Sequence, residues 1–285
     1  MTRDGSARAL LLNGRDLVRR AAEIHHTTPC TTAALGRALC AASLAGSLMG
    51  EKEDLLTLRF KGDGGGGTIV ATSDYYGNVR GFIQNPGFDP PLRGDGKLDV
   101  AACVGKGELH VLRDTGGSEP YAGISPIVSG EIAEDIAYYY ATSEQVPTIC
   151  VLGVLVDRDY SVKAAGGALI QLLPFADEAI IDLLEENLKA APPLTQALCA
   201  EAPEAILQRY LTGIEFDIFD QIEVEYRCPC DRTRTDRALV SLGTEELTRL
   251  IEEGNGAELT CQFCDKIYRY STSDLVNLRK HARRT

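Results

Sequence analysis

Four of the nine cysteines of the chain lie in two closely spaced pairs, and this pattern indicates a metal site. Cys228 and Cys230 form a CxC motif, Cys261 and Cys264 form a CxxC motif, and 30 residues separate the two motifs. In structural sites Zn²⁺ is held tetrahedrally by four ligands, with zinc–sulfur bonds of about 2.3 Å. A CxxC turn brings two thiolates together, and an extended CxC segment does the same because residues i and i+2 point to one side. We therefore expect one zinc ion per chain in a closed four-sulfur site.

Three alternative roles for the four cysteines fit the sequence less well. Unrelated cysteines would not be expected to fall into two close pairs. Structural disulfides are disfavoured in a reducing compartment, where we expect this chain to be. A thioredoxin-type CxxC motif is expected within a βαβ unit, and the surrounding sequence does not have that pattern.

The predicted site is also suited to react with oxidants. Zinc keeps its sulfur ligands deprotonated, and the thiolate is the form that oxidants attack. Neighbouring cations can offset the negative charge of four thiolates around a divalent ion; these are Arg227, Arg232, Arg234 and Lys266. The segment around the motifs has little apolar core, so metal binding is expected to supply much of its folding energy. Oxidation should then expel the metal and unfold the segment, and reduction should reverse both.

A helix is predicted between the two motifs. Thr244 is a suitable N-cap, Glu245 and Glu246 follow in the first turn, and Gly254 is suited to the C-terminal cap. Its apolar face would consist of Leu247, Leu250 and Ile251.

Composition excludes several functions. The chain has 285 residues, 44% of them hydrophobic, and a formal net charge of −12. An acidic surface repels phosphate groups, so nucleic acid and anionic membranes are unexpected partners. The longest apolar stretch without a charge, residues 38–50, has 13 residues, whereas a membrane span needs about 20. The first 20 residues do not have the pattern of a signal peptide, so we expect a cytoplasmic protein.

The distribution of charge suggests three regions. Residues 178–220 contain two basic and nine acidic residues, together with three prolines, whereas the following 65 residues are balanced at 11 of each sign. We expect a core domain in residues 1–177, a metastable acidic linker in residues 178–222 and a zinc-binding redox-switch domain in residues 223–285.

The first region alternates helix and strand patterns. Helices are predicted over residues 31–49 and 130–142, the second with Ile132, Ile136 and Tyr139 on one side. Short β-rich runs bounded by Gly and Asp clusters are predicted at residues 56–60, 68–71, 79–83, 109–112 and 148–156. The sequence therefore predicts an α+β fold: an N-terminal mixed β-sheet domain with packed helices, a helical linker and a small C-terminal zinc-binding domain.

Two short amphipathic helices are predicted in the linker. The first covers residues 178–189 with Asp177 as its N-cap, and the second covers residues 205–211. Carboxylates at three- and four-residue spacings repel one another in the first helix; they are Glu178, Asp182, Glu185 and Glu186. Helices of this length need a partner surface to be stable. We expect a segment poised between a docked and an unfolded state.

Several further residues with reactive side chains receive structural interpretations. The glycine-rich residues 61–67 lack the order of a phosphate-binding loop and predict a hairpin turn. The unpaired cysteines are interpreted as small core residues, with Cys199 in the linker as the one candidate for a redox role; they are Cys30, Cys40, Cys103, Cys150 and Cys199. The four histidines have no matching nucleophile or metal ligand. The basic residues 279–284 are interpreted as a solvated helix end.

Beyond these patterns, the chain resembles the heat-shock protein 33 family, the bacterial redox-regulated holdase chaperones also named 33 kDa chaperonins. The resemblance covers nearly the whole chain. It is carried by the CxC and CxxC signature, by residues 238–247 (ALVSLGTEEL), 56–64 (LTLRFKGDG), 130–137 (GEIAEDIA), 143–148 (SEQVPT) and 164–174 (AAGGALIQLLP). The chain departs from the family at Asp231, where Ser is usual, and at Gly65 and Gly66, where larger residues are expected.

The resemblance implies a chaperone that is not an enzyme and does not use ATP. It implies that the core domain, residues 1–177, is the substrate-binding domain. It implies that the reduced, zinc-bound form is inactive. Oxidation would form the disulfides Cys228–Cys230 and Cys261–Cys264, release zinc, unfold the linker and expose apolar surface to unfolding client proteins during oxidative stress. It further implies a homodimer in the active state.

Two rival functions share some of these residue patterns. A zinc ribbon that binds nucleic acid would fit the cysteines, but the net charge of −12 argues against it. A thiol oxidoreductase would need only one CxxC motif, and a closed four-sulfur shell argues against that.

Overall fold

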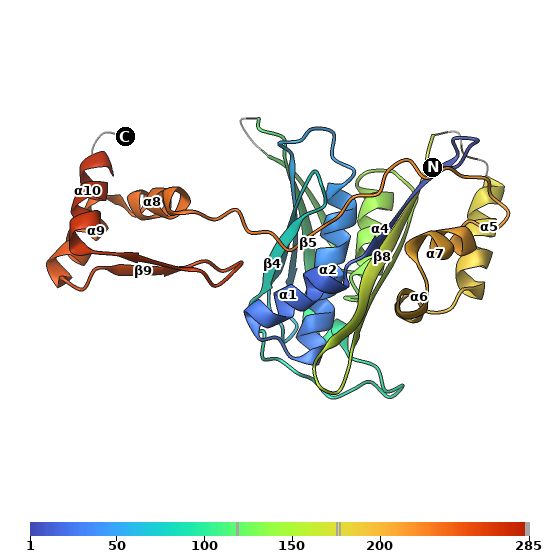
Figure 1. The fold of residues 1–285 in the computed structure, drawn as a ribbon, viewed down its shortest axis with the longest axis horizontal. Coiled ribbons are helices and arrows are strands. Elements are labelled where there is room, and N and C mark those ends of the chain that lie inside the picture. Colours follow the sequence, from blue (N-terminus) through green and yellow to red (C-terminus); the bar gives the residue numbers. More distant parts are fainter. Residues whose placement is uncertain (118–119, 175, 177, 283–285) are drawn as a thin grey trace. The chain divides into compact units, whose positions relative to one another are not determined.

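A computed structural model describes residues 1–117, 120–174, 176 and 178–282, and the chain divides into two compact units, Met1–Arg227 and Cys228–Thr285. Figure 1 shows the elements of both units along the chain. Asp177, the predicted N-cap of the first linker helix, lies outside the described residues.

The larger unit contains a five-stranded antiparallel sheet with the order β4-β3-β2-β5-β6. The strands are β2 (Leu55–Gly62), β3 (Ile69–Asp74), β4 (Val79–Ile83), β5 (Gly107–Asp114) and β6 (Tyr121–Pro126). Alternate side chains of β2 are buried, namely Leu56, Leu58 and Phe60, as expected for a sheet with one covered face. The four strands predicted in this part of the chain are confirmed, and residues 61–67 lie in the β2–β3 hairpin as predicted.

A second antiparallel sheet has the order β1-β8-β7. It consists of β1 (Ala7–Asn13), β7 (Thr148–Val156) and β8 (Val162–Leu172). The sequence predicted β7 with its observed bounds. Most residues of the central strand β8 are buried, because both faces of this sheet are covered.

Helix α2 (Pro29–Gly46) lies between the two sheets and contacts strands of both (Figure 1). Every residue of α2 except Pro29 and Arg37 is buried, which is the pattern of a helix that is apolar all round. Gly36 allows the close approach: an added Cβ would lie 2.7 Å from a methyl of Val18 and 2.9 Å from one of Val154. The helix predicted over residues 31–49 is therefore present and forms the centre of the core.

Three further helices contact α2 and lie in the same layer of the larger unit. They are α1 (Arg15–His25), α3 (Val100–Val104) and α4 (Ala133–Thr142). The predicted inward side of α4 is confirmed, since Ile132, Ile136 and Tyr139 are buried.

Helices α5 (Glu178–Ala190), α6 (Leu194–Ala200) and α7 (Pro203–Tyr210) form an outer layer against the second sheet (Figure 1). Leu184, Ile206 and Tyr210 are buried in a cluster with Ala7 and Ile170 of the sheet. The sequence predicted α5 and α7 but not α6, whose seven residues follow Pro192 and Pro193 and carry no clear stripe.

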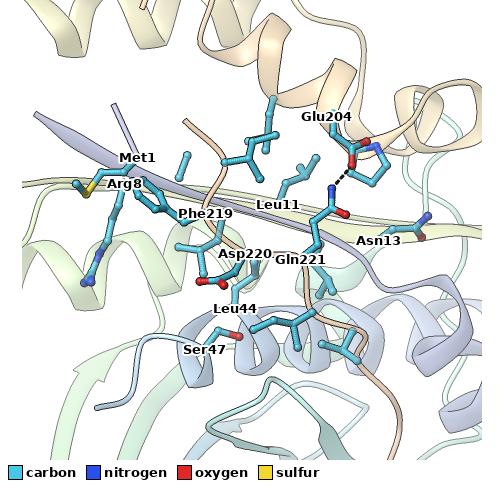
Figure 2. A pocket seen from close by; sticks show the side chains of 18 of the residues that line it. Met1, Arg8, Leu11, Asn13, Leu44, Ser47, Glu204, Phe219, Asp220 and Gln221 are labelled. Atoms are coloured by element: carbon cyan, nitrogen blue, oxygen red, sulfur yellow. Dashed lines mark hydrogen bonds between the residues drawn. The ribbon is translucent and has the colours of Figure 1, made fainter. Parts of the chain in front are cut away.

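After α7 the chain runs extended, and we call residues 216–227 the strap. Phe216 bridges Thr2 at one end, and Tyr226 bridges Val79 at the other. A groove of about 880 Å³ lies beneath it, lined by the strap, β1, α2 and α7 (Figure 2). Its lining includes apolar side chains such as Leu11, Leu44 and Phe219.

The smaller unit is built from two helices, a hairpin and a last helix. These are α8 (Arg232–Ser241), α9 (Gly243–Glu253), β9 (Ala257–Thr260), β10 (Ile267–Tyr270) and α10 (Thr272–Ala282). Its buried apolar residues are Leu239, Leu247, Tyr268, Tyr270 and Leu275.

The predicted cap of α9 is wrong at one end and confirmed at the other. Thr244 lies within the helix, because α8 ends close by and the chain enters α9 through Leu242 and Gly243 without a side-chain cap. Gly254 ends the helix in the left-handed conformation, with φ 75°.

The outer helical layer yields a first prediction. Leu184→Ala removes a fully buried side chain and should weaken the docking of α5–α7 by about 2–5 kcal/mol. Amide hydrogen exchange within the three helices should quicken accordingly. The matched control is Leu183→Ala, the same deletion at the neighbouring, half-buried position. Equal effects of the two changes would contradict the packing described here.

Candidate metal centre

The CxC motif lies at the start of the smaller unit, where the chain enters α8. Cys228 and Cys230 are half-buried, and Cys230 packs against the small apolar cluster. Asp231 is the N-cap of α8, and its Oδ1 accepts a hydrogen bond of 2.7 Å from the Arg234 amide. Asp is a favoured N-cap residue, so Asp231 is well suited to start this helix.

The CxxC motif forms the turn between β9 and β10. The Cys261 amide donates to the Lys266 carbonyl at 3.0 Å, and the Cys261 carbonyl accepts from the amides of Cys264 and Asp265 at 3.3 and 2.9 Å. Asp265 closes the turn with φ 54°. This backbone geometry turns both sulfur atoms of the motif to one side.

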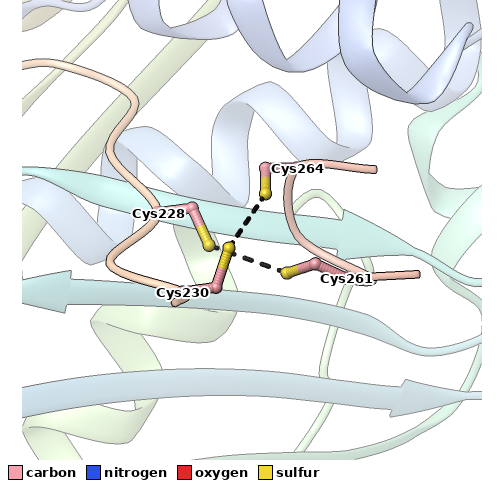
Figure 3. Close-up of side chains that lie close together, drawn as sticks. All are labelled: Cys228, Cys230, Cys261 and Cys264. Carbon is pink, nitrogen blue, oxygen red and sulfur yellow. Dashed lines mark hydrogen bonds between the residues drawn. The ribbon is translucent and has the colours of Figure 1, made fainter. Parts of the chain in front are cut away.

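The four sulfur atoms converge on one point, as Figure 3 shows. All lie within 4.8 Å of one another. Cys228 Sγ is 3.7 Å from Cys261 Sγ, and Cys230 Sγ is 3.3 Å from Cys264 Sγ. A regular tetrahedron with zinc–sulfur bonds of about 2.3 Å has edges of about 3.8 Å. The dimensions and the soft donor set therefore fit a tetrahedral zinc ion held by these four residues.

The protonation behaviour of the cluster favours a cation at its centre. Burial, with hydrogen bonds to the other thiols, raises the pKa of Cys228 to about 11 and that of Cys264 further. Burial also opposes ionisation of Cys230, but hydrogen bonds from Tyr268 and the neighbouring thiols hold its pKa below the ordinary value. One thiolate is stabilised and further ones are opposed, as expected for like groups sharing a site. A divalent cation at the centre of the cluster would offset the repulsion between neighbouring thiolates.

Tyr268 is a part of the site that the sequence patterns did not reveal. Its hydroxyl donates to Cys230 Sγ at 3.2 Å, and the Lys266 ammonium lies 5.2 Å from the centre of its ring. A lone tyrosine in a short strand gives no spacing signal.

Two of the four cations expected to offset the thiolate charge, Arg227 and Arg232, have other partners. The Arg232 guanidinium contacts Asp274 at 3.2 Å and lies over the Tyr270 ring. Arg227 belongs to the larger unit, where it pairs with Glu225 at 4.0 Å.

The other five cysteines lie in the larger unit. Cys30, Cys40 and Cys103 are fully buried, and Cys150 is half-buried, in line with the interpretation as core residues. Burial raises the pKa of Cys40 and of Cys150 to about 12, so neither is a reactive thiolate. Cys199 is exposed on α6.

A family model and two relatives that match this chain belong to one family. The family model described as "Hsp33 protein" matches residues 1–271. The 33 kDa chaperonin of Clostridioides difficile is 45% identical over 279 residues, which cover 97% of this chain and 96% of the relative. That of Ruminiclostridium cellulolyticum is 42% identical over 277 residues, covering 97% and 94%.

A solved structure is similar over the same length. The crystal structure of the 33 kDa chaperonin (heat shock protein 33 homolog) of Thermotoga maritima has a TM-score of 0.91 and 35% sequence identity. The match covers 99% of this chain and 96% of that one.

The geometry of the cluster yields a second prediction. Cys261→Ser replaces a soft ligand with a hard one, and we expect the full-length variant to lose its zinc and the circular dichroism of α8–α10. Zinc content per chain measures the first effect, and far-ultraviolet spectra measure the second. Cys199→Ser is the matched control, because Cys199 is exposed on another unit. Retention of one zinc per chain by Cys261→Ser would contradict the assignment of the four ligands.

Proposed function

Because the chain belongs to the Hsp33 family, a family of chaperones rather than enzymes, we propose that it is an ATP-independent holdase switched on by oxidation. The observation that carries this proposal is the convergence of four thiols in a unit with little other core. In the resting state Cys228, Cys230, Cys261 and Cys264 would hold one zinc ion. The bound metal would keep the sulfurs as thiolates and tie the two motifs together.

The proposed switch begins with oxidation of the sulfur ligands. Two electrons leave each pair of thiolates as the Cys228–Cys230 and Cys261–Cys264 disulfides form. For each disulfide, one hypochlorite takes up these two electrons and two protons from solvent and becomes chloride and water. Disulfide sulfurs are poor ligands, so the metal is released. All four cysteines are half-buried rather than enclosed, which gives small oxidants access to them.

Loss of the cross-link between the motifs would unfold the smaller unit. Only five apolar residues are buried among its described residues, and a core of that size rarely supports a fold without a metal or disulfide. Metal binding therefore supplies much of the folding free energy in this proposal.

After the smaller unit, the outer helical layer (α5–α7) and the strap would be the next parts to unfold. Asp182, Glu185 and Glu186 are exposed on α5, and like charges at helical spacings weaken the helix. Removal of α5–α7 would uncover the apolar residues that they now share with the second sheet, including Ala7, Ala168 and Ile170. Extended apolar surface of this kind binds unfolding polypeptides and prevents their aggregation.

The remaining features of the proposal concern location and assembly. No helix within the part of the chain that the structure describes has the length and apolarity to cross a membrane. We propose a cytoplasmic protein, where reducing conditions would keep the resting thiolates intact, and a homodimer in the active state. Nucleic acid is an unsuitable partner at a net charge of −12.

The switch is tested by following zinc and chaperone activity together. Reduced, zinc-loaded protein is treated with hypochlorite, or with peroxide at elevated temperature, while a chromogenic chelator reports free zinc. We expect about one zinc per chain to leave as suppression of citrate synthase aggregation appears, and dithiothreitol with zinc to reverse both. Zinc that stays bound, or leaves without a gain in activity, would show that the site is purely structural.

Mapping of the oxidised protein tests the disulfide pairing. We expect peptides linked within each motif. Sulfur contacts shorter than 4 Å join one cysteine of each motif, Cys228 with Cys261 at 3.7 Å and Cys230 with Cys264 at 3.3 Å. Disulfides across these contacts would hold the two motifs together and would overturn the proposed unfolding step.

Tyr268 provides a test of thiolate reactivity. A hydrogen bond to a thiolate lowers its nucleophilicity, so Tyr268→Phe should release zinc faster under limiting peroxide, by about fivefold for a bond of about 1 kcal/mol. The matched control is Tyr270→Phe, because the Tyr270 hydroxyl donates to Asp236 at 2.7 Å rather than to sulfur. Equal rates for both variants would contradict a role of Tyr268 at the sulfur.

A further inference from the structure

The last residues of the strap cover the outer edge of β4. The Val79 amide donates to the Glu225 carbonyl at 2.9 Å, and the Arg227 amide donates to the Val79 carbonyl at 2.8 Å. These bonds form a parallel bridge between Val79 and Tyr226. The strap thus binds β4 as a very short sixth strand of the five-stranded sheet.

The next outward-facing residue of β4 is satisfied by a side chain. The Tyr226 hydroxyl donates to the Gly81 carbonyl at 2.8 Å and accepts from the Gly81 amide at 3.3 Å. His25 Nε2 also lies 2.8 Å from this carbonyl. One phenol therefore occupies the place that the backbone of an added strand would take.

The register of β4 separates its two sets of backbone groups. The Asp74 amide donates to the Asn78 carbonyl and the Gln84 amide donates to the Thr68 carbonyl, so even-numbered residues of β4 face β3. Antiparallel pairing alternates along a strand, and the odd-numbered Val79 and Gly81 consequently face outward. Departure of the strap would remove the partners of the Val79 amide and carbonyl and of the Gly81 amide, and would leave the Gly81 carbonyl with His25 Nε2.

Side-chain burial in the strap describes the kind of segment that fits this edge. Val224 and Tyr226 are half-buried against the main core, whereas Glu225 and Arg227 are exposed. The edge therefore accepts an extended chain with apolar side chains at alternate positions. Such a segment occurs in almost every unfolded globular protein, and its backbone groups are the same in all of them.

We propose that the outer edge of β4, once the strap has left, receives an extended segment of an unfolded client by strand addition. The inference rests on the proposed holdase function and assigns to it a docking surface. Strand addition recognises main-chain groups and leaves selectivity to alternate side chains, which suits a protein that must bind many clients. An uncovered edge also promotes unwanted association, which gives the strap a reason to cover it at rest.

Amide hydrogen exchange of the full-length protein by nuclear magnetic resonance tests the proposal. Val79 and Gly81 should exchange slowly in the reduced, zinc-loaded protein and at least tenfold faster after oxidation. Addition of reduced, carboxymethylated α-lactalbumin, a permanently unfolded polypeptide, should slow them again. The internal controls are Arg80 and Phe82, whose amides face β3 and should stay slow throughout.

The outcomes separate this inference from the proposed function. Bound α-lactalbumin with Val79 and Gly81 still in fast exchange would overturn the docking surface and leave the holdase function intact. Val79 and Gly81 that remain slow after oxidation would do the same, because the strap would not have left. An oxidised protein that neither binds α-lactalbumin nor suppresses aggregation would overturn both.

A peptide copy of the strap provides a second measurement. A peptide of residues 221–227, QIEVEYR, should displace α-lactalbumin from the oxidised protein. The same peptide with a methylated Arg227 amide lacks the donor that bonds the Val79 carbonyl and should compete about tenfold less well, the effect of about 1.4 kcal/mol. Equal competition by the two peptides would show that binding does not use the edge of the strand.

Discussion

Four cysteine sulfurs within 4.8 Å of one another impose the constraint on which the smaller unit depends. As thiolates they would repel, and as thiols they share hydrogen bonds that favour the anion at Cys230 and oppose it at Cys228 and Cys264. A divalent cation would offset the four negative charges and join two segments that are distant in sequence. Because the apolar cluster of this unit is so small, its fold would then depend on the chemical state of the sulfurs more than on hydrophobic burial.

The fold of the larger unit, in contrast, depends mainly on hydrophobic burial. Helix α2 is enclosed between two sheets, and the core around it runs through both of them. The helices α5–α7 add only one layer, through a separate and smaller cluster. Partial unfolding that removes this layer and the strap would leave the central core intact. The surface beneath α5–α7 could therefore be uncovered without loss of the scaffold that carries it.

Spacing predicted the parts of the molecule that have a periodic signal. The cysteine motifs, the apolar α2 and the strands bounded by glycine turns were all evident in the sequence. Strand β1 was missed because its leucines are consecutive rather than alternating, and both faces of its sheet are covered. Thr244 has a side chain that can cap a helix. It lies inside α9, however, because α8 ends at Ser241 and α9 already begins at Gly243. Tyr268 reaches Cys230 only through the pairing of β9 and β10, which no local pattern encodes.

The smaller unit begins directly after the last residue of the strap, so unfolding of that unit would act on the end of the strap. Arg227 makes the last strap hydrogen bond in the larger unit, and Cys228 is the first residue of the smaller one. No spacer separates the edge of β4 from the first of the four cysteines. A folded smaller unit would anchor this end of the strap, whereas an unfolded one would add the conformational entropy of a free chain at that point. This end of the strap would then be held only by its bonds to Asn78, Val79 and Gly81 and by the packing of Val224 and Tyr226, and a short parallel bridge is poorly suited to hold it.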